Sequence, residues 1–136
     1  MPRAIKLAVT ATLAGMFLPS VSAETLLLGD PAIHQDKIAF VYAGDLYTAN
    51  RDGSNPYRLT THVADETGPV FSPDGTRIAY SANYQGNTDV YSISVNGGQP
   101  TRHTFHPGND IAVDWSNNGQ DIAFISARQR LNGRSG

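Results

Sequence analysis

The feature that most constrains the fold of this chain is an internal repeat with a period of 44 residues. When residues 45–75 are aligned with residues 89–119, nine of 31 positions are identical without a gap. The identical residues include turn formers, an aromatic residue and charged residues, in the pairs Asp45/Asp89, Tyr47/Tyr91, Gly53/Gly97, Pro56/Pro100, Arg58/Arg102, Thr60/Thr104, His62/His106, Ser72/Ser116 and Gly75/Gly119. A fixed period of this length indicates copies of one supersecondary unit.

Each unit predicts four short strands separated by turns. In the best-defined unit the strands are expected at 69–72, 77–83, 89–95 and 100–104. Ser72-Pro73-Asp74-Gly75 predicts a tight turn, because proline fixes φ at the second position and glycine accepts positive φ at the fourth. Asn96-Gly97-Gly98 predicts a type I′ hairpin, which needs positive φ at both central residues.

Four strands repeated about every 40–45 residues are typical of a β-propeller blade. A blade has apolar residues on both faces and buries them only against neighbouring blades. A β-sandwich also uses short strands, but it gives no reason for the same turn residues to recur at one period. The expected fold is therefore all-β, a partial β-propeller of about two and a half four-stranded blades. Within a propeller region at 24–128, blade one is expected at about 28–62, blade two at about 69–106 and a partial blade three at about 111–126.

The first 23 residues predict a cleavable export signal. Arg3 and Lys6 precede a short apolar run, and Val21-Ser22-Ala23 places small residues at the cleavage position. A transmembrane anchor is the alternative, but the run at 7–18 is shorter than the roughly 20 residues that span a bilayer. We expect cleavage after Ala23, release into the periplasm and no stable membrane anchor afterwards.

Composition excludes several classes of site. The chain has no cysteine, which excludes disulfides and thiolate metal sites. Its formal net charge of −2 offers no basic surface for nucleic acid. Residues 129–136 are polar and leave the blade pattern, so we expect a truncated or disordered tail and a chain that is part of a longer protein.

Several motifs resemble the propeller repeats of TolB-type translocation proteins, tricorn proteases and prolyl-oligopeptidase-like enzymes. They are the Ser72–Gly75 turn followed by Ile78-Ala79-Tyr80, and Asp89-Val90-Tyr91 followed by Asn96-Gly97-Gly98. The chain is most similar to the N-terminal propeller of bacterial tricorn protease homologues over residues 28–128. The features that carry this closer resemblance are Gly29–His34 almost directly after the signal, Arg58–His62, Asp65-Glu66-Thr67, and the longer hairpin Tyr84–Tyr91.

The resemblance implies the propeller of a periplasmic serine protease that guides or filters peptides and is not catalytic by itself. The expected partners are peptides or protein segments, downstream domains of the parent protein, and a second copy in a homo-oligomer. Two alternatives stay open: a TolB-type periplasmic binding scaffold, and the propeller part of an amidohydrolase or prolyl-oligopeptidase-like enzyme.

No catalytic, metal-binding or cofactor-binding residue is expected in this chain. The nearest candidate nucleophiles, Ser72 and Ser116, lie in repeat-equivalent turns with no base nearby, and there is no Gly-x-Ser-x-Gly motif. His103 and His106 could suggest a metal site, but side chains three apart on a strand point to opposite faces. His62 and His106 are repeat-equivalent, which favours a role at the corner of a blade.

The acidic residues are expected to be solvated in turns and at strand ends, and they do not form a calcium loop. They are Asp65, Glu66, Asp74, Asp89, Asp110, Asp114 and Asp121. The repeat-equivalent aromatic residues Phe71 and Trp115 are expected to pack between blades.

Overall fold

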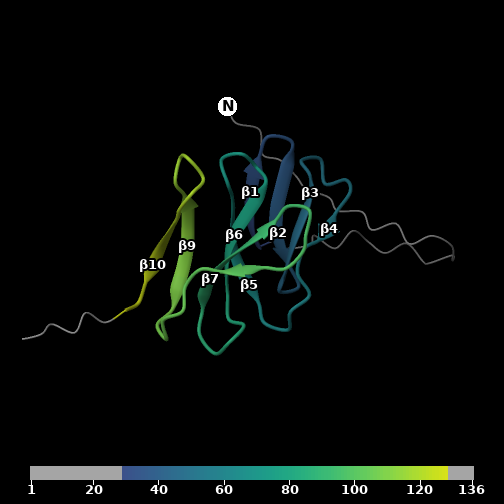
Figure 1. Ribbon diagram of the computed structural model, residues 1–136. Coiled ribbons are helices and arrows are strands. Elements are labelled where there is room, and N and C mark those ends of the chain that lie inside the picture. The colour runs from purple at the N-terminus through teal and green to yellow at the C-terminus, as the bar shows by residue number, and fades with distance from the viewer. Residues whose placement is uncertain (1–28, 129–136) are drawn as a thin grey trace, which may run out of the picture.

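The computed structural model describes residues 29–128, and all ten elements in this range are β-strands (Figure 1). Sheet 1 contains β1 (Gly29–His34), β2 (Lys37–Tyr42), β3 (Asp45–Asn50) and β4 (Tyr57–Arg58). Sheet 2 contains β5 (Glu66–Phe71), β6 (Arg77–Ala82), β7 (Asp89–Ser94) and β8 (Thr101–Arg102). Sheet 3 contains β9 (Asp110–Trp115) and β10 (Ile122–Ser126). The expected all-β chain of two four-stranded units and a partial third is confirmed.

The expected signal peptide at 1–23 and the tail at 129–136 lie outside the described residues. Between residues 29 and 128 no helix is long and apolar enough to cross a membrane.

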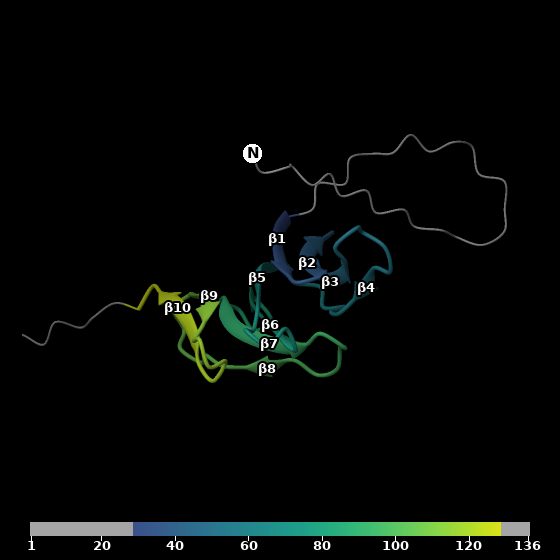
Figure 2. The ribbon, with the colours of Figure 1, turned by 90° about the horizontal axis from the view of Figure 1, so that it is seen from above.

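Within each sheet the strands pair antiparallel in sequence order. Seen from above, the three sheets lie side by side, with β5 between β1 and β9 (Figure 2). The first strand of each sheet therefore contacts the first strand of the next. This arrangement is that of consecutive blades stacked radially in a propeller.

The same turn closes the first hairpin of sheets 2 and 3. The amide of Gly75 donates to the carbonyl of Ser72, and the amide of Gly119 donates to that of Ser116, both at 2.8 Å. Both glycines have positive φ, 71° and 68°. The predicted turn at Ser72–Gly75 is confirmed, with glycine at the fourth position as expected.

The predicted type I′ turn at Asn96-Gly97-Gly98 is wrong. The turn begins earlier, because the amide of Gly97 donates to the carbonyl of Ser94 at 2.9 Å. Its central residues are Val95 and Asn96, neither of which has positive φ, and Gly97 takes the fourth position with φ 86°. The wider loop leaves only Thr101–Arg102 for β8, where the sequence predicted 100–104; Pro100 also has no N–H to give to a ladder.

An apolar core fills the seam between sheets 1 and 2. Leu46 of sheet 1 and Ile78 and Tyr80 of sheet 2 are fully buried there, and Phe71 packs with them. A second seam between sheets 2 and 3 buries Ala79, Val90 and Trp115. Phe71 and Trp115 thus occupy the same place in successive seams, as their repeat positions predict.

Sheet 3 leaves apolar side chains in contact with solvent. In sheet 2 the third strand covers the first seam with Tyr91 and Ile93. The described part of sheet 3 has two strands, and its side chains remain exposed at Ile111 (41%), Val113 (51%), Phe124 (40%) and Ile125 (67%).

Candidate functional site

Two cavities lie along the seam between sheets 1 and 2. The turn cavity, of about 420 Å³, is lined at the ends of β3, β5 and β7. The loop cavity, of about 540 Å³, is lined by the loops that follow β4 and β6 and by the loop and strand at 98–102. Both volumes fall in the range of about 300–1,000 Å³ that is typical of ligand pockets.

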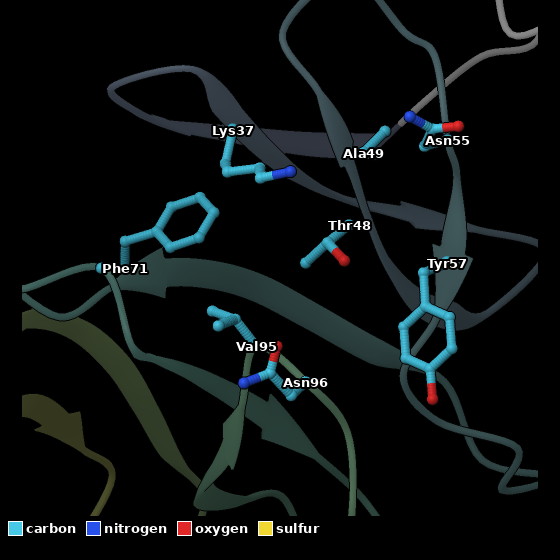
Figure 3. A pocket seen from close by; sticks show the side chains of 9 residues that line it. Lys37, Thr48, Ala49, Asn55, Tyr57, Phe71, Val95 and Asn96 are labelled. Carbon is cyan, nitrogen blue, oxygen red and sulfur yellow. The ribbon is translucent and has the colours of Figure 1, made fainter.

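The turn cavity has mixed walls. Figure 3 shows Tyr57 and Phe71 on opposite sides, with Thr48 and Val95 between them. Its one lysine, Lys37, donates from Nζ to the Asn50 side chain at 2.6 Å. The ammonium therefore has a neutral partner, and this cavity carries little that would select a particular ligand.

The loop cavity is lined by a cluster of three aromatic rings that are tilted against one another, by 39° between His62 and Tyr84 and by 54° between Tyr84 and Tyr91. The ring centroids of His62 and Tyr84 are 4.1 Å apart, and those of Tyr84 and Tyr91 are 4.7 Å apart. His62 follows β4 of sheet 1, whereas Tyr84 and Tyr91 belong to sheet 2. The ring cluster thus spans the seam and forms only when both sheets are packed together.

A buried carboxylate anchors the ring cluster through the Tyr84 hydroxyl. Glu66, the first residue of β5, is fully buried and accepts hydrogen bonds from the Tyr84 hydroxyl (2.5 Å), the Thr60 hydroxyl (2.6 Å) and the Leu46 amide (3.1 Å). Burial raises the pKa of Glu66, and the hydrogen bonds from Thr60 and Tyr84 offset part of that rise. Burial, together with the bond to Glu66, raises the pKa of the Tyr84 hydroxyl.

Beside the third strand of each complete sheet, an aspartate, an arginine and a threonine are joined by hydrogen bonds. We call each of these groups an arginine bracket. In sheet 2, Arg102 donates to Asp89 at 2.7 Å and to the carbonyl of Thr104 at 2.8 Å. The Thr104 hydroxyl in turn accepts from the Val90 amide at 3.0 Å. Sheet 1 repeats these bonds with Asp45, Arg58, Thr60 and Leu46. The repeat identities contained this bracket, but its role was not predicted.

The hydroxyls of both candidate serines form hydrogen bonds that stabilise the turns in which they lie. The Ser72 hydroxyl donates to Asp74 at 2.6 Å and accepts from the Arg77 amide at 3.0 Å. The Ser116 hydroxyl makes the equivalent bonds to Asn118 and from the Asp121 amide. These hydrogen bonds account for the recurrence of serine at this position of the repeat.

The histidines at 103 and 106 have separate partners. His103 Nε2 is 2.8 Å from the Ser92 hydroxyl, whereas His106 Nδ1 accepts from the Gly108 amide at 3.0 Å. Because β8 ends at Arg102, the alternation of a strand does not apply to them. Among the described residues no group of three His, Asp or Glu side chains could hold a metal ion.

The pair Ser92 and His103 was missed in the sequence, because its members belong to different repeat positions. Burial lowers the pKa of His103, and the nearby Arg77 lowers it further. A neutral histidine beside a serine is a feature of nucleophilic sites. Ser92 is only 5% exposed, however, so its hydroxyl is closed to a substrate. The hydrogen bond to His103 instead joins β7 to the chain after β8.

The expectation that the acidic residues are solvated is wrong for three of them. Glu66, Asp89 and Asp110 are fully buried at the starts of β5, β7 and β9. Each has a partner that compensates for burial: Glu66 has Tyr84, Asp89 has Arg102, and Asp110 has Arg128 at 3.0 Å. A pattern of turns and strand ends does not reveal such partners, because they come from other parts of the chain, 13–18 residues away.

Relatives with this repeat include two kinds of protein. The chain is 32% identical over 93 residues to the Tol-Pal system protein TolB of Desulfosudis oleivorans, covering 65% of this chain and 21% of that protein. It is 28% identical over 101 residues to tricorn protease homolog 1 of Streptomyces coelicolor, covering 73% of this chain and 9% of that protein. The chain thus spans only 21% and 9% of the length of these two relatives.

Solved structures show the same fold. The tricorn protease superimposes on 68% of this chain with a TM-score of 0.61 and 23% identity, over 10% of its own length. TolB from Acinetobacter baumannii superimposes on 77% with a TM-score of 0.62 and 20% identity, over 27% of its length. The family model for the tricorn protease N-terminal beta propeller domain matches residues 25–136. The repeated four-stranded sheets and this match together show that the chain belongs to the family of tricorn protease N-terminal β-propeller domains.

Proposed function

We propose that the chain is the N-terminal propeller part of an exported tricorn-type serine protease, in which it binds peptide or protein segments and leaves bond cleavage to other domains. The match of residues 25–136 to the tricorn N-terminal propeller carries this proposal. The cavities between sheets 1 and 2 support a binding role. The candidate serines support the non-catalytic part, because their hydroxyls are engaged in turns.

Export to the periplasm is part of the proposal. It is supported by the basic residues Arg3 and Lys6, the apolar run at 7–18 and the small residues before Glu24. The proposed signal at 1–23 follows from the same features, and the proposed propeller repeats at 24–128 follow from the internal repeat. The partners we propose are peptides, the downstream domains of the parent protein, and a second copy of it.

A TolB-type binding scaffold is the second candidate function. The 32% identity to the TolB of Desulfosudis oleivorans over 65% of this chain favours it. Such a scaffold would bind a folded protein partner and would have no peptidase domain. The propeller part of an amidohydrolase or prolyl-oligopeptidase-like enzyme would instead accompany a different hydrolase.

The intact gene product distinguishes these candidates. We expect a product longer than 136 residues in the periplasmic fraction, with Glu24 as its first residue and a peptidase activity that a serine-directed inhibitor abolishes. Residues 24–136 alone should hydrolyse no peptide, and Ser72→Ala and Ser116→Ala should leave the activity of the intact product unchanged. A product without peptidase activity that co-purifies with a folded envelope protein would favour the TolB-type scaffold and contradict the protease proposal.

A further inference from the structure

The loop cavity presents aromatic surface that is fixed in place. Tyr84 is held at its hydroxyl by Glu66 and at its ring by Tyr91, which is 4% exposed. The His62 ring also contacts the Tyr84 ring, and its Nδ1 accepts from the Ala64 amide at 3.2 Å. A binding surface that is already ordered loses little conformational freedom when a ligand binds.

The lining of the loop cavity has no unpaired charge. Its one arginine, Arg102, donates to Asp89 (2.7 Å), to Gln85 (2.6 Å) and to the carbonyl of Thr104 (2.8 Å). No carboxylate is among the lining residues. A charged group that entered would lose hydration without gaining an opposite charge, so the cavity favours a neutral group.

Polar groups stand around these rings. Thr61, Gln85 and Gln99 line the cavity and are exposed, so their hydroxyl and amide groups can bond the main chain of a bound segment. The buried hydroxyl of Tyr91 has no hydrogen-bond partner within residues 29–128.

An exposed aromatic residue lies next to the cavity. Phe105 is 70% exposed, and the Arg102 guanidinium lies 4.8 Å from the centre of its ring. Tyrosine, phenylalanine and arginine are enriched at the centres of protein interfaces. Phe105 thus adds exposed aromatic surface beside Arg102, which lines the cavity.

From these observations we infer that the loop cavity is a subsite for one neutral ring-bearing side chain, proline or an aromatic residue, of an extended peptide segment. The ring packs against the rings of His62 and Tyr84, and the main chain on either side bonds Thr61, Gln99 and the amide nitrogen of Gln85. This inference rests on the proposed peptide-binding function and adds to it the class of side chain and the place where it binds.

The test uses the intact gene product and fluorescent probe peptides of Gly and Ser with one central residue. The central residue is Trp, Phe, Pro, Ala, Lys or Glu, and fluorescence anisotropy gives each Kd. The variant is His62→Ala, and its matched control is His106→Ala. Each variant loses one of two repeat-equivalent histidines whose Nδ1 accepts a local amide, but of the two only His62 lines the cavity and contacts the Tyr84 ring.

We expect the Trp, Phe and Pro probes to bind more tightly than the Ala, Lys and Glu probes. His62→Ala should weaken the Trp probe roughly three- to tenfold, as expected for the loss of one ring contact, and His106→Ala should not. A Phe probe with a photoreactive ring should crosslink within 59–62, 84–85 or 98–102. Peptide binding with no preference for rings, or with equal effects of the two variants, would overturn the subsite and leave the proposed function standing. Binding of no probe at all would contradict both.

Discussion

A buried polar side chain, Glu66, connects sheets 1 and 2. It is the first residue of β5, yet two of its three hydrogen-bond donors, Leu46 and Thr60, precede it in sheet 1 and the loop that follows. The third, Tyr84, follows β6. The Glu66 carboxylate therefore joins the first repeat to the second. A change in its protonation should alter the strength of this contact between the repeats.

Replacement of Glu66 tests this coupling, because it should change how the free energy of unfolding depends on pH. Since burial raises the pKa of folded Glu66 above the ordinary value of 4.5, its contribution to stability is fully present below that value and is lost as the pH rises through the folded pKa. Glu66→Gln should therefore flatten the fall in the free energy of unfolding between pH 4.5 and neutral pH. Glu66→Ala should cost about 1–3 kcal/mol at acidic pH, because it leaves buried donors without an acceptor.

Urea unfolding of the intact propeller at a series of pH values measures both effects. An unchanged pH slope in Glu66→Gln would show that the carboxylate titrates as it does in water, which would contradict its burial.

The two arginine brackets provide a second comparison of single residues. Arg102 is paired with a fully buried carboxylate and has a side chain only 20% exposed, whereas Arg58 is 46% exposed. Arg102→Met should cost about 3–5 kcal/mol, because Asp89 remains buried without its partner. Arg58→Met should cost about 0–1 kcal/mol. Denaturant unfolding of the two variants measures this difference, and equal losses would mean that burial does not separate the brackets.

The sequence alone predicted which residues recur but not what they contact. Asp89, Arg102 and Thr104 were visible as identities of the repeat. Their partnership was not, because Asp89 and Arg102 meet across a strand pair whose register depends on the turn between them. The loop cavity was missed for a similar reason: His62 and Tyr84 belong to different blades and meet only after the sheets pack.

At the scale of elements, the turns that join the first two strands of a sheet set the distance between neighbouring sheets. The Ser72–Gly75 turn lies against the ring of His34 at the end of β1, and that ring is 5.7 Å from the ring of Phe71. Glycine at the fourth turn position thus allows both the positive φ of the turn and the close approach of His34 at the end of β1.

Alanine at Gly75 and Gly119 separates these two requirements. Both positions have positive φ, which should cost alanine about 1–2 kcal/mol. A Cβ at Gly75 would lie 2.5 Å from Cδ2 of His34, whereas a Cβ at Gly119 would lie 3.6 Å from Cδ of Pro73, an ordinary contact. Gly75→Ala should therefore lower the melting temperature of the intact propeller more than Gly119→Ala. Equal shifts would show that β1 moves aside without cost.

Strands with a clear alternation and a short turn were predicted well. The expected strands at 77–83 and 89–95 are observed as Arg77–Ala82 and Asp89–Ser94. The strand expected at 69–72 begins earlier, at Glu66, because that residue pairs with Ala82 across β6. Glycine and proline at 68 and 69 concealed this start, and a bulge between Thr67 and Val70 accommodates them.

At the scale of the whole molecule, the two seams between sheets differ in how well they are covered. The first seam has Tyr91 and Ile93 from a third strand, and both are buried. In the second seam Phe124 is 40% exposed, and Ile125 on the same strand is 67% exposed. Within residues 29–128 the outer edge of this sheet has no partner strand, and apolar surface beside such an edge promotes association. We therefore propose that further blade structure covers sheet 3.

The most direct test of this proposal is sedimentation velocity combined with thermal melting of purified residues 24–136. We expect oligomers or aggregates and a broad transition, and a monodisperse, cooperative species once further blades of the parent protein are restored. A monodisperse monomer of residues 24–136 with a sharp, cooperative transition would show that these repeats close by themselves, and would contradict the account of a partial propeller.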